Sequence, residues 1–149
     1  MDNIESNKRL IETYPFLAIK RTYDPKTETY HTPHDYDYSS TWLDYMPIGW
    51  KKAFGEQLCK ELKKTLDENG FTNKYLVAQV KEKFGGLRWY DYGVPDGCHV
   101  HDIIRKYSDI SYHTCCECGK PATKTTKGWV LPYCDSCYNE YHSKKENYE

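Results

Sequence analysis

Two cysteine pairs, Cys115-Cys-Glu-Cys118 and Cys134-Asp-Ser-Cys137, lie near the C-terminal end of the chain. Two residues separate the outer cysteines of each pair, and 15 residues separate the pairs. This spacing is typical of a structural zinc site, because each pair can occupy a tight turn that points both sulfurs at one ion. The sequence therefore predicts one structural Zn²⁺, with a short hairpin between the pairs. Its expected ligands are Cys115, Cys118, Cys134 and Cys137.

A four-thiolate zinc site stabilises structure and leaves no open coordination position for chemistry. The seven cysteines are an odd number, and the charged, polar segment Met1–Leu10 does not resemble a signal peptide. Both observations favour a reducing cytosol over a disulfide framework. The other three cysteines are expected to be small buried or half-exposed side chains outside the site: Cys59, Cys98 and Cys116.

The composition predicts one domain with an aromatic core. Of the 149 residues, 38% are hydrophobic and 15% are aromatic, including 15 tyrosines. A chain of this length buries about two-thirds of its unfolded surface, and large amphipathic rings supply much of the core. No apolar run approaches the length that spans a membrane, so no membrane partner is expected.

Charge is distributed unevenly along the chain. The formal net charge of −1 removes the simplest argument for non-specific nucleic-acid binding, which usually needs a basic domain. Asp24–Tyr45 has a local net charge of −4, however, whereas Lys51–Arg88 has a local net charge of +4. This pattern is consistent with two opposed surfaces, although charged faces that contact only solvent are the commoner outcome.

Three helices are expected. The clearest begins at Pro47 and ends at Asn69-Gly70, and apolar side chains recur at every fourth position within it. A second amphipathic helix is expected at His99–Ser111, and a shorter one at Asn3–Thr13, where Pro15 follows.

Extended segments lie between these helices. Tyr75–Lys81 alternates in polarity and Leu87–Tyr92 is aromatic, so the two predict a β-hairpin around a Gly85-Gly86 turn. Phe16–Tyr23 is also expected to be extended. Asp24–Tyr45 has no helical period and predicts a long surface loop or a pair of irregular strands.

These elements predict an α+β fold, in which helices pack on a β-hairpin or small antiparallel sheet and a zinc ribbon follows at the C-terminal end. We divide the chain into an N-terminal helix with a tyrosine-rich extension (1–46), an α+β core (47–112) and a zinc-ribbon module (113–149), which together form one compact domain. The expected core residues are Trp50, Phe54, Leu58, Leu62, Val80, Leu87, Ile103 and Ile104.

The run from Gln79 to Tyr90, QVKEKFGGLRWY, resembles a KEKFGGLR[FW]Y motif in a family of small zinc-ribbon proteins of bacteriophages and prophages. That family also has a Gly-Trp at the start of the preceding helix and paired cysteine knuckles after the hairpin. The matching residues are Gly49-Trp50, Thr114-Cys115, Cys118-Gly119, Gly128-Trp129, Cys134 and Cys137. The resemblance covers residues 47 to 138. It implies a viral origin, a zinc ribbon and a location in the host cytoplasm, but no particular activity.

The hairpin combines positive charge with flat rings beside a glycine turn. Such a combination suits a phosphate and a stacked base. The candidate ligand-binding residues are Lys81, Lys83, Arg88, Trp89 and Tyr90. The alternative is that Leu87 and Trp89 pack towards the helices and that the cations contact only solvent, because strands with one apolar face are the norm.

Catalytic patterns are weak, and no catalytic residue is assigned. A second metal site is conceivable in the N-terminal extension, from His31, His34, Asp35 and Asp37, but such residues are common in exposed loops. The cluster at Cys98–Asp102 is more simply a polar helix start, because residues two apart in a helix do not share a face.

The sequence therefore favours a small phage accessory protein that acts by binding a nucleotide, a nucleic acid or a host protein. By analogy with other such proteins, it would act against a host defence. For a protein partner, the acidic, tyrosine-rich loop at Asp24–Tyr45 is a rival surface, because tyrosine-rich loops make good interface anchors. The alternative is a small metal-dependent hydrolase or nuclease that uses the His/Asp-rich loop, and an additional exchangeable divalent ion would favour it.

Overall fold

The computed structural model describes residues 3–147, with side chains described up to residue 143. Its helices are α1 (Asn3–Thr13), α2 (Ile48–Trp50), α3 (Glu56–Asn69), α4 (His99–Ser111) and α5 (Asp135–Asn147). Its strands are β1 (Thr22–Asp24), β2 (Thr29–His31), β3 (Leu76–Lys83), β4 (Gly86–Tyr92), β5 (Lys124–Thr125) and β6 (Pro132–Tyr133). They pair in three antiparallel hairpins, so the fold is the α+β class that the sequence predicts.

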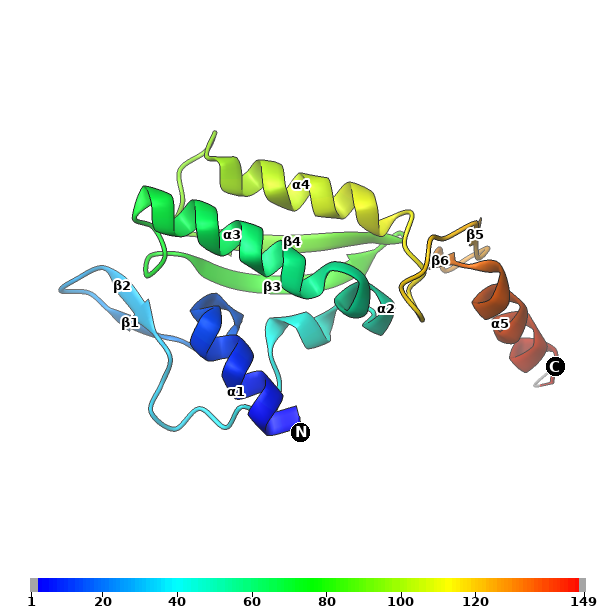
Figure 1. The fold of residues 1–149 in the computed structure, drawn as a ribbon, viewed down its shortest axis with the longest axis horizontal. Coiled ribbons are helices and arrows are strands. Elements are labelled where there is room, and N and C mark those ends of the chain that lie inside the picture. Colours follow the sequence, from blue (N-terminus) through cyan, green and yellow to red (C-terminus); the bar gives the residue numbers. More distant parts are fainter. Residues whose placement is uncertain (1–2, 148–149) are drawn as a thin grey trace.

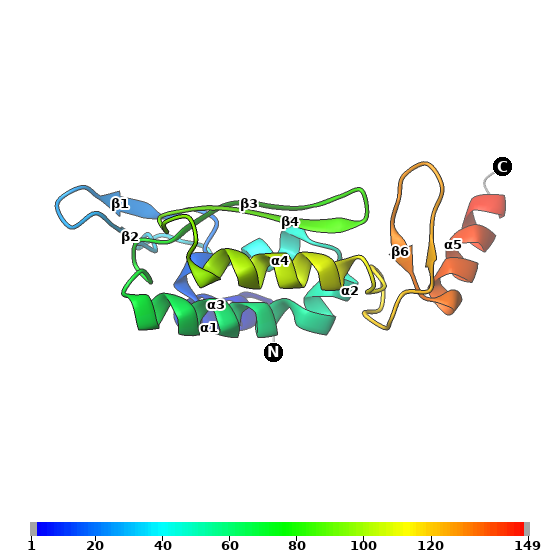
Figure 2. The same cartoon turned by 90° about the horizontal axis from the view of Figure 1, so that it is seen from above.

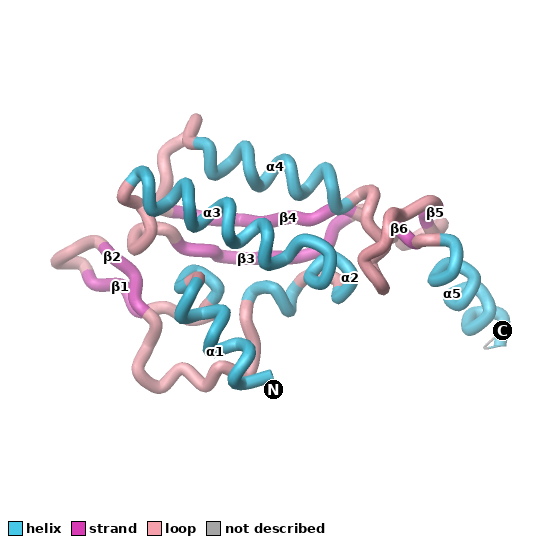
Figure 3. Tube along the Cα trace, in the orientation of Figure 1, coloured by secondary structure: helices cyan, strands magenta, loops and turns pink. Residues whose placement is uncertain are grey.

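The β3–β4 hairpin lies at the centre of the fold (Figure 1). Helices α3 and α4 form one layer on one side of this hairpin (Figure 2). The β1–β2 hairpin lies near its open end, whereas the β5–β6 hairpin and α5 lie beyond its turn (Figure 3). Within the described part of the chain, no helix or strand covers the side of β3–β4 that points away from α3 and α4.

The segment from α2 to α3 is one continuous helical run, which confirms the helix predicted from Pro47 to Gly70. A π-helical turn at Lys51–Gly55 joins α2 to α3. The run ends at Gly70, which has a left-handed φ of 72° and whose N–H bonds back to the carbonyls of Leu66 and Asp67. Such a glycine satisfies carbonyls that the helix itself leaves free.

A β-bulge in β3 changes the face to which its side chains point. Val77 pairs with Asp91 and Gln79 pairs with Tyr90, so Ala78 has no partner of its own. As a result, Val77 and Val80 both point into the core, whereas Ala78 is exposed. The strict alternation predicted for Tyr75–Lys81 is therefore wrong at this position.

Strand β4 alternates regularly. Leu87 and Trp89 are buried towards the helices, as the alternative for this strand predicted. The opposite side of the hairpin is called the outer face, and it consists of Gln79, Lys81, Arg88, Tyr90 and Tyr92.

The turn of the hairpin consists of Phe84 and Gly85, not of the predicted Gly85-Gly86 pair, because Lys83 already pairs with Gly86. Phe84 and Gly85 have φ values of 54° and 84°, which is the pattern of a type I′ turn. A Cβ on Gly86 would overlap the ring of Tyr112. The two glycines thus have different functions: Gly85 permits the turn, and Gly86 leaves room for a ring.

The N-terminal segment differs from its prediction. Phe16–Tyr23 is not one extended stretch, because Pro15–Leu17 forms a 3₁₀ turn and only Thr22 and Tyr23 of the segment lie in β1. The side chains of Phe16, Leu17 and Ala18 are all buried, a pattern that a half-exposed strand cannot produce. Asp24–Tyr45 contains β2 and a 3₁₀ turn at Trp42–Tyr45.

Two clusters of buried side chains stabilise the molecule. The larger joins α1, the Trp42–Tyr45 turn, α3, β3, β4 and α4, and the smaller surrounds the cysteine pairs. Six of the eight predicted core residues are buried: Trp50, Phe54, Leu58, Leu62, Val80 and Leu87. Ile103 and Ile104 are only half-buried against the same core, because Val100, Tyr107 and Ser111 form the innermost face of α4. The three-segment division of the chain stays a prediction.

Replacing Phe54 by alanine should lower the free energy of unfolding by about 3–5 kcal/mol, as is usual for a buried ring. Phe54 is buried between Trp50 and Tyr107, with ring centroids 6.4 and 5.4 Å away. Urea denaturation is the measurement, and Phe84→Ala is the matched control because Phe84 is exposed. Equal stability of the two variants would contradict this view of the core.

Candidate functional site

Four sulfurs converge in the C-terminal module. The Sγ atoms of Cys115, Cys118, Cys134 and Cys137 all lie within 4.8 Å of one another. The Cys118 and Cys134 sulfurs are 3.6 Å apart. Tetrahedral bonds of about 2.3 Å to zinc would place sulfurs about 3.8 Å from each other. The cluster can therefore hold a metal ion such as zinc.

Backbone hydrogen bonds shape the first pair of cysteines into a tight knuckle. The Gly119 N–H donates to the carbonyl of Cys115 at 3.1 Å, and the Cys115 N–H donates to the carbonyl of Lys120 at 2.8 Å. Gly119 has a φ of 85°, a conformation that favours glycine. The Cys116 N–H donates to the carbonyl of Pro132, which ties the knuckle to β6.

The second pair lies at the start of α5. Cys134 immediately precedes the helix, and Cys137 belongs to its first turn. The Cys137 N–H donates to the Cys134 sulfur at 3.4 Å. A helix N-terminus favours negative charge, so this position suits a thiolate.

The thiols of the cluster differ in acidity. Burial raises the pKa of Cys115, but hydrogen bonds from the backbone N–H groups of Cys118, Cys134 and Glu117 outweigh it and lower that pKa to about 6. Burial raises the pKa of Cys137, and hydrogen bonds with the neighbouring sulfurs raise it further. Four thiolates at this separation repel one another, so a bound cation is what allows all four to ionise.

The remaining cysteines lie outside the cluster, as predicted. Cys59 and Cys116 are buried, and Cys98 is half-buried. Burial raises the pKa of Cys116 to about 11, so this side chain stays a neutral thiol at physiological pH.

The cysteine knuckle docks directly on the start of α2. The Gly49 N–H donates to the carbonyl of Cys116 at 2.8 Å, and the Trp50 indole Nε1 donates to the carbonyl of Thr114 at 2.9 Å. A Cβ on Gly49 would overlap the carbonyl oxygen of Cys115. Gly49 is therefore required for close backbone approach, not for an unusual φ.

The five candidate ligand-binding residues have different environments. Lys81 and Tyr90 share the outer face, where the Lys81 Nζ lies 5.8 Å from the centroid of the Tyr90 ring. Lys83 lies beside the turn, 5.6 Å from the Phe84 ring. The other two are Arg88, half-buried and bonded to the Leu87 carbonyl and the Tyr112 hydroxyl, and Trp89, which is in the core.

A shallow groove of about 670 Å³ lies along the outer face. Tyr90 and Tyr92 line it from β4, with side chains 44% and 65% exposed. Tyr45 and Trp42 line it from the 3₁₀ turn that flanks β3. The sequence places Trp42 and Tyr45 in the rival loop Asp24–Tyr45 but does not show that this loop lies beside the hairpin. Tyr92 was left out of the candidate set, although the alternation of β4 places it on the same face as Arg88 and Tyr90.

A buried polar chain lies on the inner side of the hairpin. The Trp89 indole donates to the Tyr75 hydroxyl at 2.9 Å, and this hydroxyl donates to Asp91 at 2.5 Å. Burial, and then the Asp91 carboxylate, raise the pKa of Tyr75. His101 Nε2 lies 3.2 Å from the other Asp91 oxygen. These hydrogen bonds pair the Trp89 indole N–H, the Tyr75 hydroxyl and both Asp91 oxygens, so they fix the Trp89 side chain in the core.

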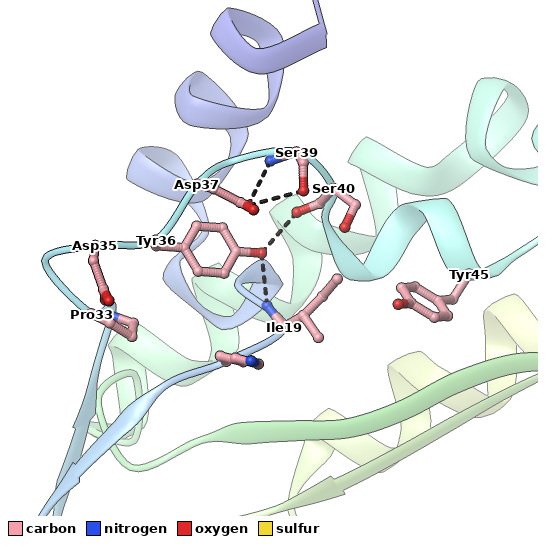
Figure 4. A pocket seen from close by; sticks show the side chains of 9 residues that line it. Ile19, Pro33, Asp35, Tyr36, Asp37, Ser39, Ser40 and Tyr45 are labelled. Carbon is pink, nitrogen blue, oxygen red and sulfur yellow. Dashed lines mark hydrogen bonds between the residues drawn. The ribbon is translucent and has the colours of Figure 1, made fainter.

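The acidic loop is ordered by its own side chains (Figure 4). The Tyr36 hydroxyl accepts from the Ile19 N–H and donates to the Ser40 carbonyl, across a pocket of about 330 Å³. The Asp37 carboxylate accepts from the N–H and hydroxyl of Ser39, and these bonds lower the pKa of Asp37.

The histidine and aspartate side chains of this loop do not form a metal-ligand group. Among the described residues, the four cysteines are the one set of three or more His, Cys, Asp or Glu side chains that gather closely enough for metal binding. His31 instead lies 2.8 Å from the hydroxyl of Thr29.

Comparison of the chain with family models, with curated proteins and with solved structures finds no match. No helix in the described residues has the length and apolar character needed to cross a membrane.

Replacing Gly49 by alanine should destabilise the fold by about 1–3 kcal/mol, the usual cost of overpacking, because the added methyl group displaces the Cys115 carbonyl. Thermal unfolding of the metal-loaded protein is the measurement. Gly55→Ala is the matched control, because its Cβ would meet Leu43 at an ordinary 3.5 Å. A loss of stability in the control as large as that in Gly49→Ala would show that docking space is not the cause.

Proposed function

We propose that this chain is a zinc-stabilised binding protein whose outer face takes a single-stranded nucleic acid. The metal identity rests on the donor set, because four thiolates in two knuckles suit Zn²⁺ better than harder cations. With four protein ligands, the ion has a structural role. It holds the knuckle against α2 and β6 against α5.

The observation that carries the binding proposal is the uncovered outer face, on which a lysine and exposed tyrosine rings share a groove. Tyr90 and Tyr92 offer ring surfaces on which bases can stack, and Lys81 places a cation beside them. Proteins that bind single strands use this combination of aromatic platforms and positive charge. Arg88 contributes its charge at the edge while bonded to Tyr112.

An extended ligand fits this surface better than a mononucleotide. The eight-residue strand β3 spans about 26 Å at about 3.3 Å per residue, and the groove runs beside its residues 78–81 and beside Tyr90 and Tyr92 of β4. The acidic segment Asp24–Tyr45 contributes the uncharged side chains of Trp42 and Tyr45 to the groove, and its Asp44 is paired with Lys51. The remaining carboxylates of the segment repel phosphate from the rest of that loop.

The resemblance to phage proteins suggests where the protein would act and against what. A small accessory protein of a phage would act in the host cytoplasm, and binding a nucleic acid there would interfere with a host defence that recognises or produces it. The support for this setting is the QVKEKFGGLRWY run with its two cysteine pairs.

The purified protein should contain one zinc per chain, measured by elemental analysis after preparation without chelators. Cys118→Ser should abolish zinc binding and unfold the C-terminal module, because structural zinc contributes roughly 10–16 kcal/mol of apparent binding energy at neutral pH. Zinc should also dissociate on acidification, since protons compete for the thiolates. Cys98→Ser, outside the cluster, is the control and should keep the metal; a wild-type protein free of zinc would exclude the site.

Tyr90→Ala should weaken binding of a single-stranded oligonucleotide by about 1–3 kcal/mol, the value of one lost base stack. Lys81→Ala should reduce the salt dependence of the affinity, because fewer counterions are released. Fluorescence anisotropy with labelled 12-mers at two salt concentrations measures both effects. Tyr23→Ala is the control, since Tyr23 is a similarly exposed tyrosine on the distant β1–β2 hairpin. If wild-type protein binds no oligonucleotide at low salt, the proposal fails and a protein partner takes its place.

A further inference from the structure

We infer that the cleft between the tips of two hairpins is a second stacking site, which takes a nucleobase between Phe84 and Trp129; the inference rests on the nucleic-acid binding proposed above. The two tips are the Phe84-Gly85 turn of β3–β4 and the loop between β5 and β6. Figure 2 shows the β5–β6 loop beside that turn, rising on the side away from α3 and α4. The cleft between them lies at the turn end of β3–β4.

The rings at the cleft are unusually exposed for their size. Phe84 is 70% exposed and Trp129 is 74% exposed, although both line the same cleft of about 290 Å³. Its other walls are Gly128, Val130 and the side chains of Glu82 and Lys83. A volume near 300 Å³ is at the small end of ligand pockets, which suits one flat ring.

The backbone conformation of Phe84 indicates that phenylalanine at this position does not stabilise the turn. Its φ of 54° is a conformation that a bulky side chain rarely adopts, whereas asparagine or glycine adopts it readily. A strained residue that exposes an apolar ring is a candidate for function, because it brings the fold no buried contact.

Hydrogen bonds close the β5–β6 loop, and this loop lies close to the Phe84-Gly85 turn. The Thr126 hydroxyl donates to the Trp129 carbonyl and accepts from the Leu131 N–H, which closes the loop. A Cβ on Gly85 would lie 3.3 Å from the Val130 side chain, so this glycine also permits the approach of the two hairpins. The zinc module thus positions Trp129 against the central hairpin.

The positive charge around the cleft indicates which kind of ligand it would bind. Residues 81–88 and 124–131, which form the two tips and the strands next to them, contain five Lys or Arg and one Glu, for a net charge of +4. The Glu82 carboxylate accepts a hydrogen bond from the Gly85 N–H, so it is engaged within its own turn. A flat ring attached to a negatively charged backbone fits these surroundings, and a nucleotide of a single strand has both features.

One strand can reach both stacking sites. Tyr90 and Phe84 are six residues apart along β4 and the turn, which is about 20 Å at about 3.3 Å per residue. A short oligonucleotide can bridge this distance, and the second contact is then intramolecular and strengthens the first.

Trp129 provides an optical test, because it is 74% exposed, whereas Trp50 and Trp89 are buried in the core and Trp42, which lines the outer-face groove, is only 8% exposed. Titration of the zinc-loaded protein with an unlabelled 12-mer should quench the tryptophan emission of wild type. Trp129→Phe should lose this quenching but keep the affinity within about twofold, since it retains a ring. Trp129→Ala should weaken binding about 5- to 150-fold, the range for one lost stack.

Phe84→Asn separates binding from folding. Its melting temperature should equal or exceed that of wild type, because asparagine tolerates the turn conformation, while its affinity should fall as in Trp129→Ala.

If the 12-mer binds with unchanged affinity to Trp129→Ala and Phe84→Asn, the tip site is excluded and the outer-face proposal stands. If Trp129→Ala weakens binding and Tyr90→Ala does not, the proposed site at the hairpin tips is supported and the proposed site in the outer-face groove is excluded. If no variant or wild type binds, both are excluded.

Discussion

The contact between the first cysteine knuckle and the start of α2 determines how the two buried clusters sit relative to each other. It consists of backbone atoms and one indole N–H, so it tolerates no side chain at Gly49. Because Trp50 also belongs to the larger core, the same few atoms connect the metal site to the helices and the hairpin. A metal ion held by the four cysteines would therefore fix the knuckle against the helices and the hairpin as well as within its own module.

The two sides of the central β3–β4 hairpin carry different kinds of side chain. On its inner side, the hydrogen bonds among Trp89, Tyr75 and Asp91 leave no polar group of these three side chains unpaired. Its outer side carries rings and cations that have few partners in the fold. A hairpin fixed in this way on its inner side would lose little entropy if its outer side bound the proposed ligand.

Features with a long or strict period could be predicted from the sequence. The helix from Pro47 to Gly70 follows from its four-residue repeat, and the cysteine ligands follow from their spacing. The bulge at Ala78 could not be predicted, because one extra residue reverses the face of a strand and leaves no compositional trace. Trp129 was not among the candidate residues for a related reason: its position in one cleft with Phe84 depends on how two hairpins dock, and no local pattern specifies that arrangement.

The π-helical turn at Lys51–Gly55 has a consequence for how the chain tolerates length changes. In a regular α-helix, a side chain at every fourth position drifts by about 40° per step around the axis. The wider π turn offsets one such step, so Trp50 and Phe54 can both face the core while Gly49 still faces the knuckle. The π turn changes the rotation of the helix between Gly49, which contacts the knuckle, and Phe54, which packs in the core. Deleting one residue within it would preserve a helix but turn its two ends out of register, so we expect this short segment to tolerate a deletion poorly.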